Sequence, residues 1–311
     1  MESDTVTLTI TIEDEGKRLD KLLSEKFPEY SRVQIQVAIR TGQMLVNEIT
    51  SKPAYHVTAG DSITFTPLEK EKSMEIVPQE IPLDVIYEDE YLVAINKPAG
   101  LVVHPGFGNQ DGTLVNAMLA RYPQVADVGD LIRAGIVHRL DKDTSGIILV
   151  ALTEQIQRDL IEQFKVRDIS KFYVGLVENQ PRTESGHIDA PIGRDPKKRK
   201  RMAVIQNGKS AQTDYFTLEN FENHTLLELH PHTGRTHQLR VHLAFIGCPI
   251  VGDRVYGFRK QIIKLKRLFL HAKSITFLHP VTGKEMHLNT ELPDKLENIL
   301  IHLRQLEVDR L

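Results

Sequence analysis

Ionisable side chains crowd into residues 135–146, which read Gly-Ile-Val-His-Arg-Leu-Asp-Lys-Asp-Thr-Ser-Gly. Asp141 stands there between Arg139 and Lys142. Because nearby positive charge favours the ionised form of a carboxylic acid, Asp141 is expected to be an anion at neutral pH. Such a carboxylate can serve as a nucleophile or as a base in catalysis. A turn on the protein surface uses the same residue types, and local composition does not separate the two interpretations.

Two apolar runs beside this segment predict the strands that must hold it. Residues 134–137 precede the charged loop, and residues 147–152 follow it. The second run is rich in β-branched residues and carries no charge, so it is expected to be a buried strand. A loop held between core strands presents its side chains in fixed positions.

The composition is that of a soluble globular protein with room for one large domain and one small one. Of the 311 residues, 41% are hydrophobic and 26% are charged. No run approaches the roughly 18 apolar residues of a membrane helix, and the N-terminal Met-Glu-Ser-Asp does not resemble a secretory signal. Cys248 is the only cysteine and follows an apolar segment. We therefore expect a buried thiol, no intramolecular disulfide and a reducing cytoplasm.

The net charge of −3 excludes a protein coated in positive charge but leaves room for a local basic patch. The densest basic cluster follows Gly-Arg-Asp-Pro, so it is expected to be an exposed loop that binds phosphates in a salt-dependent manner. A merely solvated charge run is the alternative. The thirteen histidines show no zinc-ligand spacing, so no metal is expected. The basic cluster consists of Lys197, Lys198, Arg199, Lys200 and Arg201.

Residues 1–67 are predicted to form a separate small α/β module, and the charged, aperiodic residues 68–80 a linker. Alternation predicts strands, and apolar residues at helical spacing predict two helices, with Ser31 as a candidate N-cap for the second. The predicted elements are a strand over residues 6–12, helices over 18–27 and 31–41, and strands over 44–46 and 62–66.

Residues 81–311 mix strands, helices and hairpins, which predicts an α+β domain on a mostly antiparallel mixed sheet. Strands are expected over residues 83–87, 92–95, 172–177, 214–218, 225–230, 274–278 and 285–288, and helices over 113–121, 153–165, 236–246 and, briefly, from 294.

The N-terminal module resembles the S-four type of RNA-binding domain, which is named after a ribosomal protein. Met44 and Glu48 depart from the family preference for Val and Gly, which weakens the expectation of RNA affinity. A small α/β unit that docks on the large domain is the alternative. The resemblance implies an RNA contact at Arg32, and it rests on Arg18-Leu19-Asp20, Ser31-Arg32, Gly42, Val46-Asn47 and Gly60-Asp61.

Four segments of the large domain together resemble the RluA/RluD-type family of RNA pseudouridine synthases. The match runs in order across roughly residues 81–290. It implies isomerisation of uridine to pseudouridine in structured RNA, with no cofactor or metal. Large-subunit ribosomal RNA is the favoured substrate and tRNA the next. The segments are Asn-Lys-Pro-Ala-Gly at 96–100, His-Arg-Leu-Asp with Thr-Ser-Gly at 138–146, Lys-Phe-Tyr at 171–173 and Gly-Arg-Thr-His-Gln at 234–238.

By this resemblance Asp141 is the catalytic carboxylate, with Asp143 as its rival. Arg235 is expected to form the ion pair with it, whereas Arg240, five residues further on, is expected to point elsewhere. Tyr173 would stack on the target base and take part in removing the proton from carbon 5.

A uridine inside folded RNA must be flipped out before it can react. The resemblance implies that Arg139 fills the gap in the base stack and that Leu239 lies beneath the flipped base. His138, Lys171 and Lys97 are expected to contact phosphates or to support the pocket.

Two other functional classes are alternatives to a pseudouridine synthase. A non-catalytic RNA-binding or ribosome-assembly factor needs no buried carboxylate, and an aspartate-dependent hydrolase of small molecules leaves the N-terminal module without a role. The sequence leaves open whether Asp141 attacks the anomeric carbon of the ribose or removes a ribose proton to give a glycal. No coiled coil or apolar repeat suggests assembly, so a monomer is expected.

Overall fold

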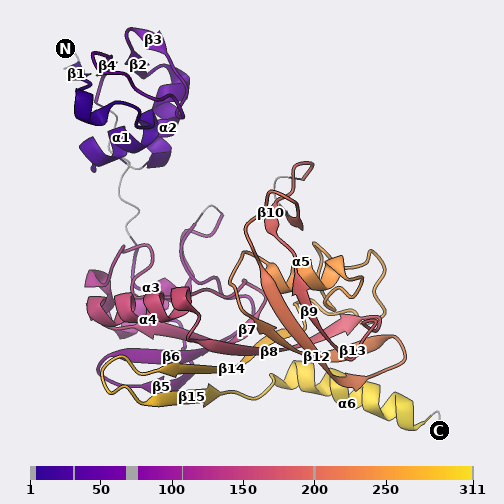
Figure 1. The fold of residues 1–311 in the computed structure, drawn as a ribbon. Coiled ribbons are helices and arrows are strands. Elements are labelled where there is room, and N and C mark those ends of the chain that lie inside the picture. Colours follow the sequence, from indigo (N-terminus) through magenta and orange to yellow (C-terminus); the bar gives the residue numbers. More distant parts are fainter. Residues whose placement is uncertain (1–4, 31, 68–75, 107, 199–200, 310–311) are drawn as a thin grey trace. The chain divides into compact units, whose positions relative to one another are not determined.

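The computed structural model describes residues 5–30, 32–67, 76–106, 108–198 and 201–309 (Figure 1). It divides into two compact units, residues 1–75 and 76–311, each with its own hydrophobic core.

The second unit begins earlier than the sequence predicts. Ile76 is buried in its core, and the backbone N–H of Gln79 donates to the carbonyl of Asn116 at 3.0 Å. Residues 76–80, which were assigned to the linker, therefore belong to the second unit. The rest of the predicted linker, residues 68–75, lies outside the described residues.

The first unit combines two helices with a four-stranded antiparallel sheet in the order β1-β4-β2-β3. Leu22 and Leu23 of its first helix meet Ile35 and Ile39 of its second in the core, as the helical spacing predicts. Its elements are β1 (Val6–Thr9), η1 (Ile12–Asp14), α1 (Leu19–Lys26), α2 (Arg32–Thr41), β2 (Met44–Val46), β3 (Ile49–Thr50) and β4 (Ser62–Phe65).

Glu48 occupies the turn between β2 and β3, where the family pattern prefers glycine. Asn47 and Glu48 have φ angles of 49° and 65°. Positive φ at both central residues is the conformation of the tightest hairpins, and glycine adopts it with less strain than glutamate. The hairpin is thus kept despite the substitution.

The second unit is built on a nine-stranded sheet in the order β5-β6-β7-β14-β8-β13-β12-β9, with β15 paired to β14. The sheet strands are β5 (Val85–Glu88), β6 (Leu92–Lys97), β7 (Ser145–Ala151), β8 (Ser170–Glu178), β9 (Ser185–Asp189), β12 (Gln212–Asn220), β13 (His224–Pro231), β14 (Leu270–Leu278) and β15 (Glu285–Asn289). The remaining elements are α3 (Leu114–Arg121), η2 (Pro123–Asp127), α4 (Glu154–Val166), α5 (Gln238–Phe245), α6 (Asp294–Val308) and the hairpin of β10 (Ile192–Arg194) and β11 (Met202–Val204).

Helices cover both faces of this sheet, as alternation along its strands requires. Val93 and Ile95 of β6 share a core with α3 and α5, whereas Leu92 and Ala94 share one with α4. Val174 and Leu176 of β8 pack against α6, which runs along the sheet toward the C-terminus in Figure 1. The predicted α+β class and mostly antiparallel sheet are confirmed.

One strand pairing departs from the antiparallel pattern. β7 and β14 pair in parallel, with Gly146 opposite Ala272. Gly146 has a φ of 114°, and a Cβ atom there would lie 2.2 Å from the carbonyl oxygen of Ala272. The position therefore requires glycine, since both the backbone angle and the close approach exclude a side chain.

Several boundaries differ from the predicted ones. The predicted strand at 134–137 is wrong: Ala134 and Gly135 have positive φ, and Ile136 alone makes a bridge, to Val150. The short apolar run was a core turn, which periodicity cannot separate from a strand. The C-terminal helix is longer than expected. No ranges were predicted for β9, β10 and β11, because strands of five, three and three residues are too short to show a clear alternation.

Candidate active site

Asp141 lies in a loop that runs directly into β7 and is fastened from below. The ammonium group of Lys97, at the end of β6, donates to the carbonyls of Pro98 (2.8 Å), Leu101 (2.9 Å) and Lys142 (3.2 Å). The backbone N–H of Gly100 donates to the same Lys142 carbonyl. Lys97 is fully buried, and this burial lowers its pKa to about 7. Its role is to hold the loop and not to contact phosphate.

Arg240, not Arg235, forms the ion pair with Asp141. Arg240 Nη1 lies 3.1 Å from Asp141 Oδ2, and Asp253 accepts from Arg240 Nε at 2.7 Å and from Nη2 at 3.0 Å. Arg235 is exposed, and its Nε donates to the carbonyl of Ser210. The expectation for both arginines is therefore wrong. The resemblance had pointed to Arg235, and Arg240 was expected to face away from Asp141. In the structure Arg240 lies in the first turn of α5, which begins at Gln238, and its side chain is buried.

The two acids fix the charge of this arginine. Burial alone would lower the pKa of Arg240, but the bonds to Asp253 and the charge of Asp141 outweigh it and raise the pKa above its usual range. For the acid Asp253 burial acts in the opposite direction and would raise the pKa, but the hydrogen bonds from Arg240 lower it below its usual range. A permanent guanidinium thus faces Asp141 and stabilises a carboxylate there.

A cavity of about 390 Å³ opens beside this ion pair. Asp141, Tyr173, Lys171 and Leu239 all line it. Tyr173 on β8 and Leu239 on α5 are buried in one core, so the cavity wall next to the carboxylate is rigid and apolar. Burial first, and then the charge of Asp141, raises the pKa of the Tyr173 hydroxyl, which keeps it protonated at neutral pH. A cavity of this size fits a flat heterocyclic base.

His138 supports the cavity as a neutral ring. Its Nε2 accepts the backbone N–H of Leu149 at 2.9 Å, and its ring lies against Phe164 with centroids 4.7 Å apart. Burial, with a smaller contribution from the charge of Lys171, lowers the pKa of His138 to about 3. Burial also lowers the pKa of Lys171, to about 8, and its ammonium lies 5.4 Å from the Phe164 ring centre.

Arg139 is exposed at the rim and lines two cavities. The second cavity, of about 300 Å³, also contains His104, Asn109 and Asp141. The Asp141 carboxylate therefore lies between two openings, and Arg139 is placed where it can reach a nucleic acid that enters either of them.

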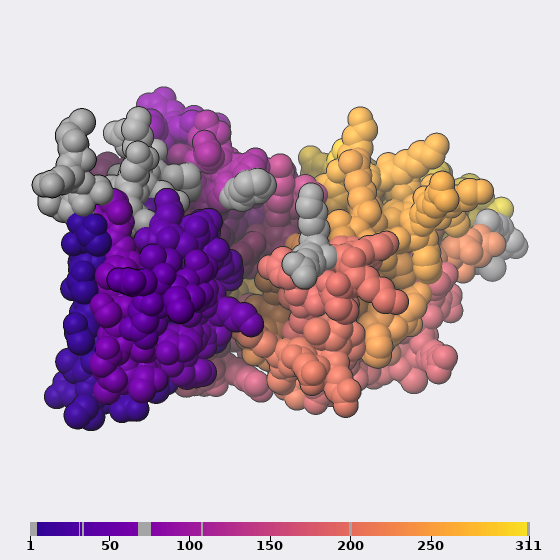
Figure 2. Space-filling model, turned by 90° about the horizontal axis from the view of Figure 1, so that it is seen from above, coloured from indigo at the N-terminus to yellow at the C-terminus, as the bar shows by residue number. Residues whose placement is uncertain are grey.

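The predicted basic cluster borders the hairpin of β10 and β11, which packs against Val241 of α5 and against Tyr256. In Figure 2 the salmon surface that includes this hairpin lies beside the orange surface of later residues. Lys197 and Lys198 are exposed, and the Asp195 carboxylate accepts their backbone N–H groups. The Arg201 guanidinium lies 5.0 Å from the ring centre of Tyr256. Arg199 and Lys200 lie outside the described residues.

Arg32 is bound to a buried carboxylate of the first unit. Its guanidinium donates to Asp20 at 2.8 Å, and Arg18 and Gln36 donate to the same buried carboxylate. Burial would raise the pKa of Asp20, but these donors lower it below its usual range. Arg32 is nevertheless half exposed, with a relative side-chain exposure of 46%. It can therefore face an RNA while it stabilises the module.

Sequence reasoning missed two residues that connect the site. Asp253 anchors Arg240, and the Tyr256 hydroxyl accepts the backbone N–H of Met202 and bonds to His237 Nδ1, both at 2.9 Å. The stretch Gly-Asp-Arg-Val-Tyr-Gly at 252–257 was the available signal, since a charged and an aromatic residue between glycines indicate a structured turn.

Comparison with known proteins defines the class of this fold and site. The RNA pseudouridylate synthase family matches residues 91–245, and the S4 domain matches residues 17–63. Two solved human structures are similar. RNA Pseudouridylate Synthase Domain Containing 4 gives a TM-score of 0.57 at 27% identity over 71% of this chain and 93% of its own. Domain Containing 1 gives 0.56 at 25% identity over 73% and 96%.

Curated relatives cover nearly the whole chain. A protein of Xanthomonas campestris pv. campestris, named Ribosomal large subunit pseudouridine synthase D, is 43% identical over 93% of this chain and 90% of its own. The protein of that name from Escherichia coli (strain K12) is 43% identical over 96% and 95%. The chain therefore belongs to the RNA pseudouridylate synthase family and is an RNA pseudouridine synthase. In the part of the chain that the structure describes, no helix is long and apolar enough to cross a membrane.

Proposed function

We propose that this protein converts specific uridines of large-subunit ribosomal RNA to pseudouridine, with Asp141 as the catalytic carboxylate. The names of the relatives in Xanthomonas campestris and Escherichia coli support this substrate. The S4 match at residues 17–63 supports an RNA-binding role for the first unit, and residues 76–311 would carry the reaction. A monomer that works in the cytoplasm completes the proposal. tRNA is the alternative substrate.

The observation that carries the mechanism is the Asp141 carboxylate, held by Arg240 at the wall of a cavity that also contains Tyr173. A uridine flipped out of the RNA would place its base against Tyr173 and Leu239. The exposed side chain of Arg139 would then occupy the position that the flipped base leaves in the base stack.

The reaction breaks the bond between N1 of uracil and C1′ of ribose and forms a bond from C5 to C1′. The proton on C5 leaves and N1 gains one, so the reaction is an isomerisation. Asp141 acts either by attacking C1′ or by removing the C2′ proton to give a glycal. Either role requires an ionised carboxylate, which the Arg240 guanidinium stabilises.

Release of tritium from C5-labelled uridine in RNA tests the activity directly. We expect release from large-subunit ribosomal RNA fragments by the unaltered protein. Asp141→Asn is expected to abolish release and leave RNA binding within about twofold, because it removes the charge and keeps the shape. Full activity of this variant would exclude Asp141 as the catalytic residue. Release from tRNA alone would overturn the ribosomal substrate.

A non-catalytic RNA-binding factor would bind the same RNA without tritium release. Asp143 provides the matched control, because it lies in the same loop, whereas the acidic partners of Arg240 among the described residues are Asp141 and Asp253. Asp143→Asn is expected to keep most of the turnover, whereas a loss equal to that of Asp141→Asn would point to loop structure as the cause.

A further inference from the structure

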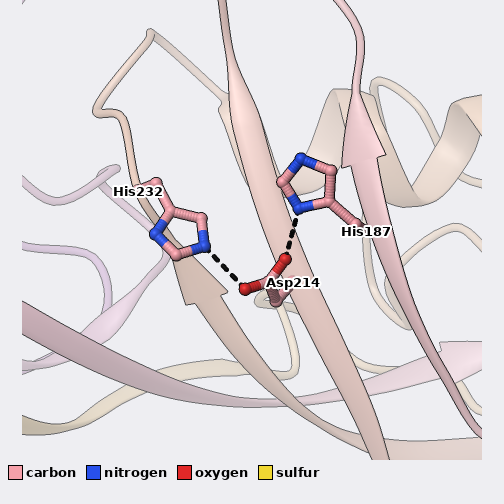
Figure 3. A group of neighbouring side chains, drawn as sticks. All are labelled: His187, Asp214 and His232. Atoms are coloured by element: carbon pink, nitrogen blue, oxygen red, sulfur yellow. Dashed lines mark hydrogen bonds and ion pairs between the residues drawn. The ribbon is translucent and has the colours of Figure 1, made fainter.

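A cluster of two histidines and one carboxylate lies outside the reaction described above. His187 comes from β9, Asp214 from β12, and His232 follows β13 directly. Figure 3 shows both imidazole rings turned toward the one carboxylate. His187 Nδ1 lies 2.5 Å from Asp214 Oδ1, and His232 Nε2 lies 2.6 Å from Asp214 Oδ2. We propose that these three residues bind a transition-metal ion of the zinc class.

The donor set is one that zinc prefers. Imidazole nitrogens and a carboxylate oxygen bind Zn²⁺ at about 2.0–2.2 Å, and three protein ligands leave a fourth position for water. The ligand atoms of the three residues all lie within 4.8 Å of one another. In a tetrahedral zinc site they would lie about 3.4 Å apart. Side-chain rotations that move the ligand atoms by about an ångström would therefore complete the site.

The backbone already holds the three ligands together. Asp214 and His187 are directly opposite each other in the antiparallel pair of β12 and β9. The backbone N–H of His232 donates to the carbonyl of Gln212, two residues before Asp214, at 3.1 Å. Ligands placed on paired strands lose little conformational entropy when they bind an ion.

Solvent can reach the cluster. The side chains of His187 and His232 are 50% and 44% exposed, and that of Asp214 is 28% exposed. An ion from solution can therefore enter, and a water molecule can occupy the fourth position. The ligands are separated by 27 and 18 residues in the chain, so no short ligand motif marks them in the sequence.

The consequence of binding would be local. His232 and the three residues after it line the Asp141 cavity, whereas His187 does not. An ion shared by His187 and His232 would fasten the segment after β13 to β9 and β12, and so stabilise that wall of the cavity.

Zinc binding by untagged protein, stripped with a chelator, tests this site. In competition with a chromophoric chelator we expect one saturable equivalent of Zn²⁺ per chain and a rise in melting temperature with zinc concentration. His187→Gln keeps a donor toward Asp214 but is a poor zinc ligand, and we expect at least a tenfold loss of affinity. Its tritium release without zinc should equal that of the unaltered protein.

The matched control is His302→Gln, an exposed histidine on α6, which should leave zinc affinity unchanged. Asp214→Asn is a second ligand variant, and its melting temperature in chelator reports whether the fold is kept. Equal zinc affinity in the His187→Gln and unaltered proteins, or no saturable binding in either, would overturn the proposal.

Discussion

Asp141 depends on a chain of charges that reaches into the protein interior. Arg240 pairs with Asp141 on the cavity side and with the fully buried Asp253 on the other. Asp253 is held in turn by the backbone N–H groups of Val255 and Tyr256. The position of the proposed catalytic group is therefore set by a turn more than a hundred residues away in the sequence.

Arginine 240 can be distinguished from arginine 235 by substitution. Arg240→Lys keeps a positive charge but cannot bridge two carboxylates in the same geometry, so we expect roughly a 100-fold loss of turnover. Arg240→Ala should also lower the free energy of unfolding by about 3–5 kcal/mol, because Asp253 loses its buried cation. Arg235→Ala is the control, and a loss of turnover as large as that of Arg240→Lys would contradict the assignment.

His138 predicts a loss of stability in acid. The fold lowers its pKa from 6.5 to about 3, so between these values the unfolded chain binds more protons than the native one. The contribution of His138 to stability is therefore present above pH 6.5 and is lost as the pH falls toward 3. Denaturant unfolding at pH 7 and pH 5 measures it. His138→Gln keeps an acceptor for Leu149 without titrating, so its stability should fall less over this range.

At the scale of elements, the hairpin of β10 and β11 connects the basic cluster to the site. Arg201 and Arg240 each lie 5.0 Å from the ring centre of Tyr256, and Tyr256 also bonds to Met202 and His237. The last residue of the cluster thus contacts the same tyrosine ring as Arg240 of α5, whereas Lys197 and Lys198 face solvent.

This difference predicts two separable effects on RNA. Replacing residues 197–200 with serine should weaken RNA binding and flatten its dependence on salt, because fewer counterions are displaced. Chemistry on bound RNA should be unchanged in single-turnover assays. Arg201→Ala should slow the single-turnover step as well, since it loosens the packing of Tyr256. An unchanged salt slope in the serine variant would show that the cluster does not contact RNA.

Sequence patterns predicted the helices and strands better than the contacts between residues that are distant in the chain. The helices predicted over residues 113–121 and 153–165 begin at Thr113 and Thr153, which cap α3 and α4 in the structure, because capping is a local property. The pairing of Arg240 depended on which side of α5 faces Asp141, and the cluster of His187 with His232 depended on the order of strands. Both are tertiary facts that no local spacing contains.

The whole molecule consists of two units with separate cores, which gives each a stability of its own. Deletion of residues 1–75 should leave a single cooperative unfolding transition and intact chemistry in the remainder, because its core does not include the first unit. Affinity for RNA should fall by roughly tenfold or more, since phosphate contacts are lost. Calorimetry and tritium release measure the two effects, and loss of the transition would show that the second unit cannot fold alone.

Gly146 limits the substitutions that the segment around the proposed catalytic residue can tolerate. Because Gly146 has no Cβ atom, Ala272 of β14 can pack directly against its backbone, just after the loop that carries Asp141. A relative that had lost its aspartate could retain the scaffold and become a plain RNA binder. A relative without this glycine would need a different packing of β7 against β14 at this point. Gly146 is therefore required by the fold, whereas Asp141 is required by the proposed reaction.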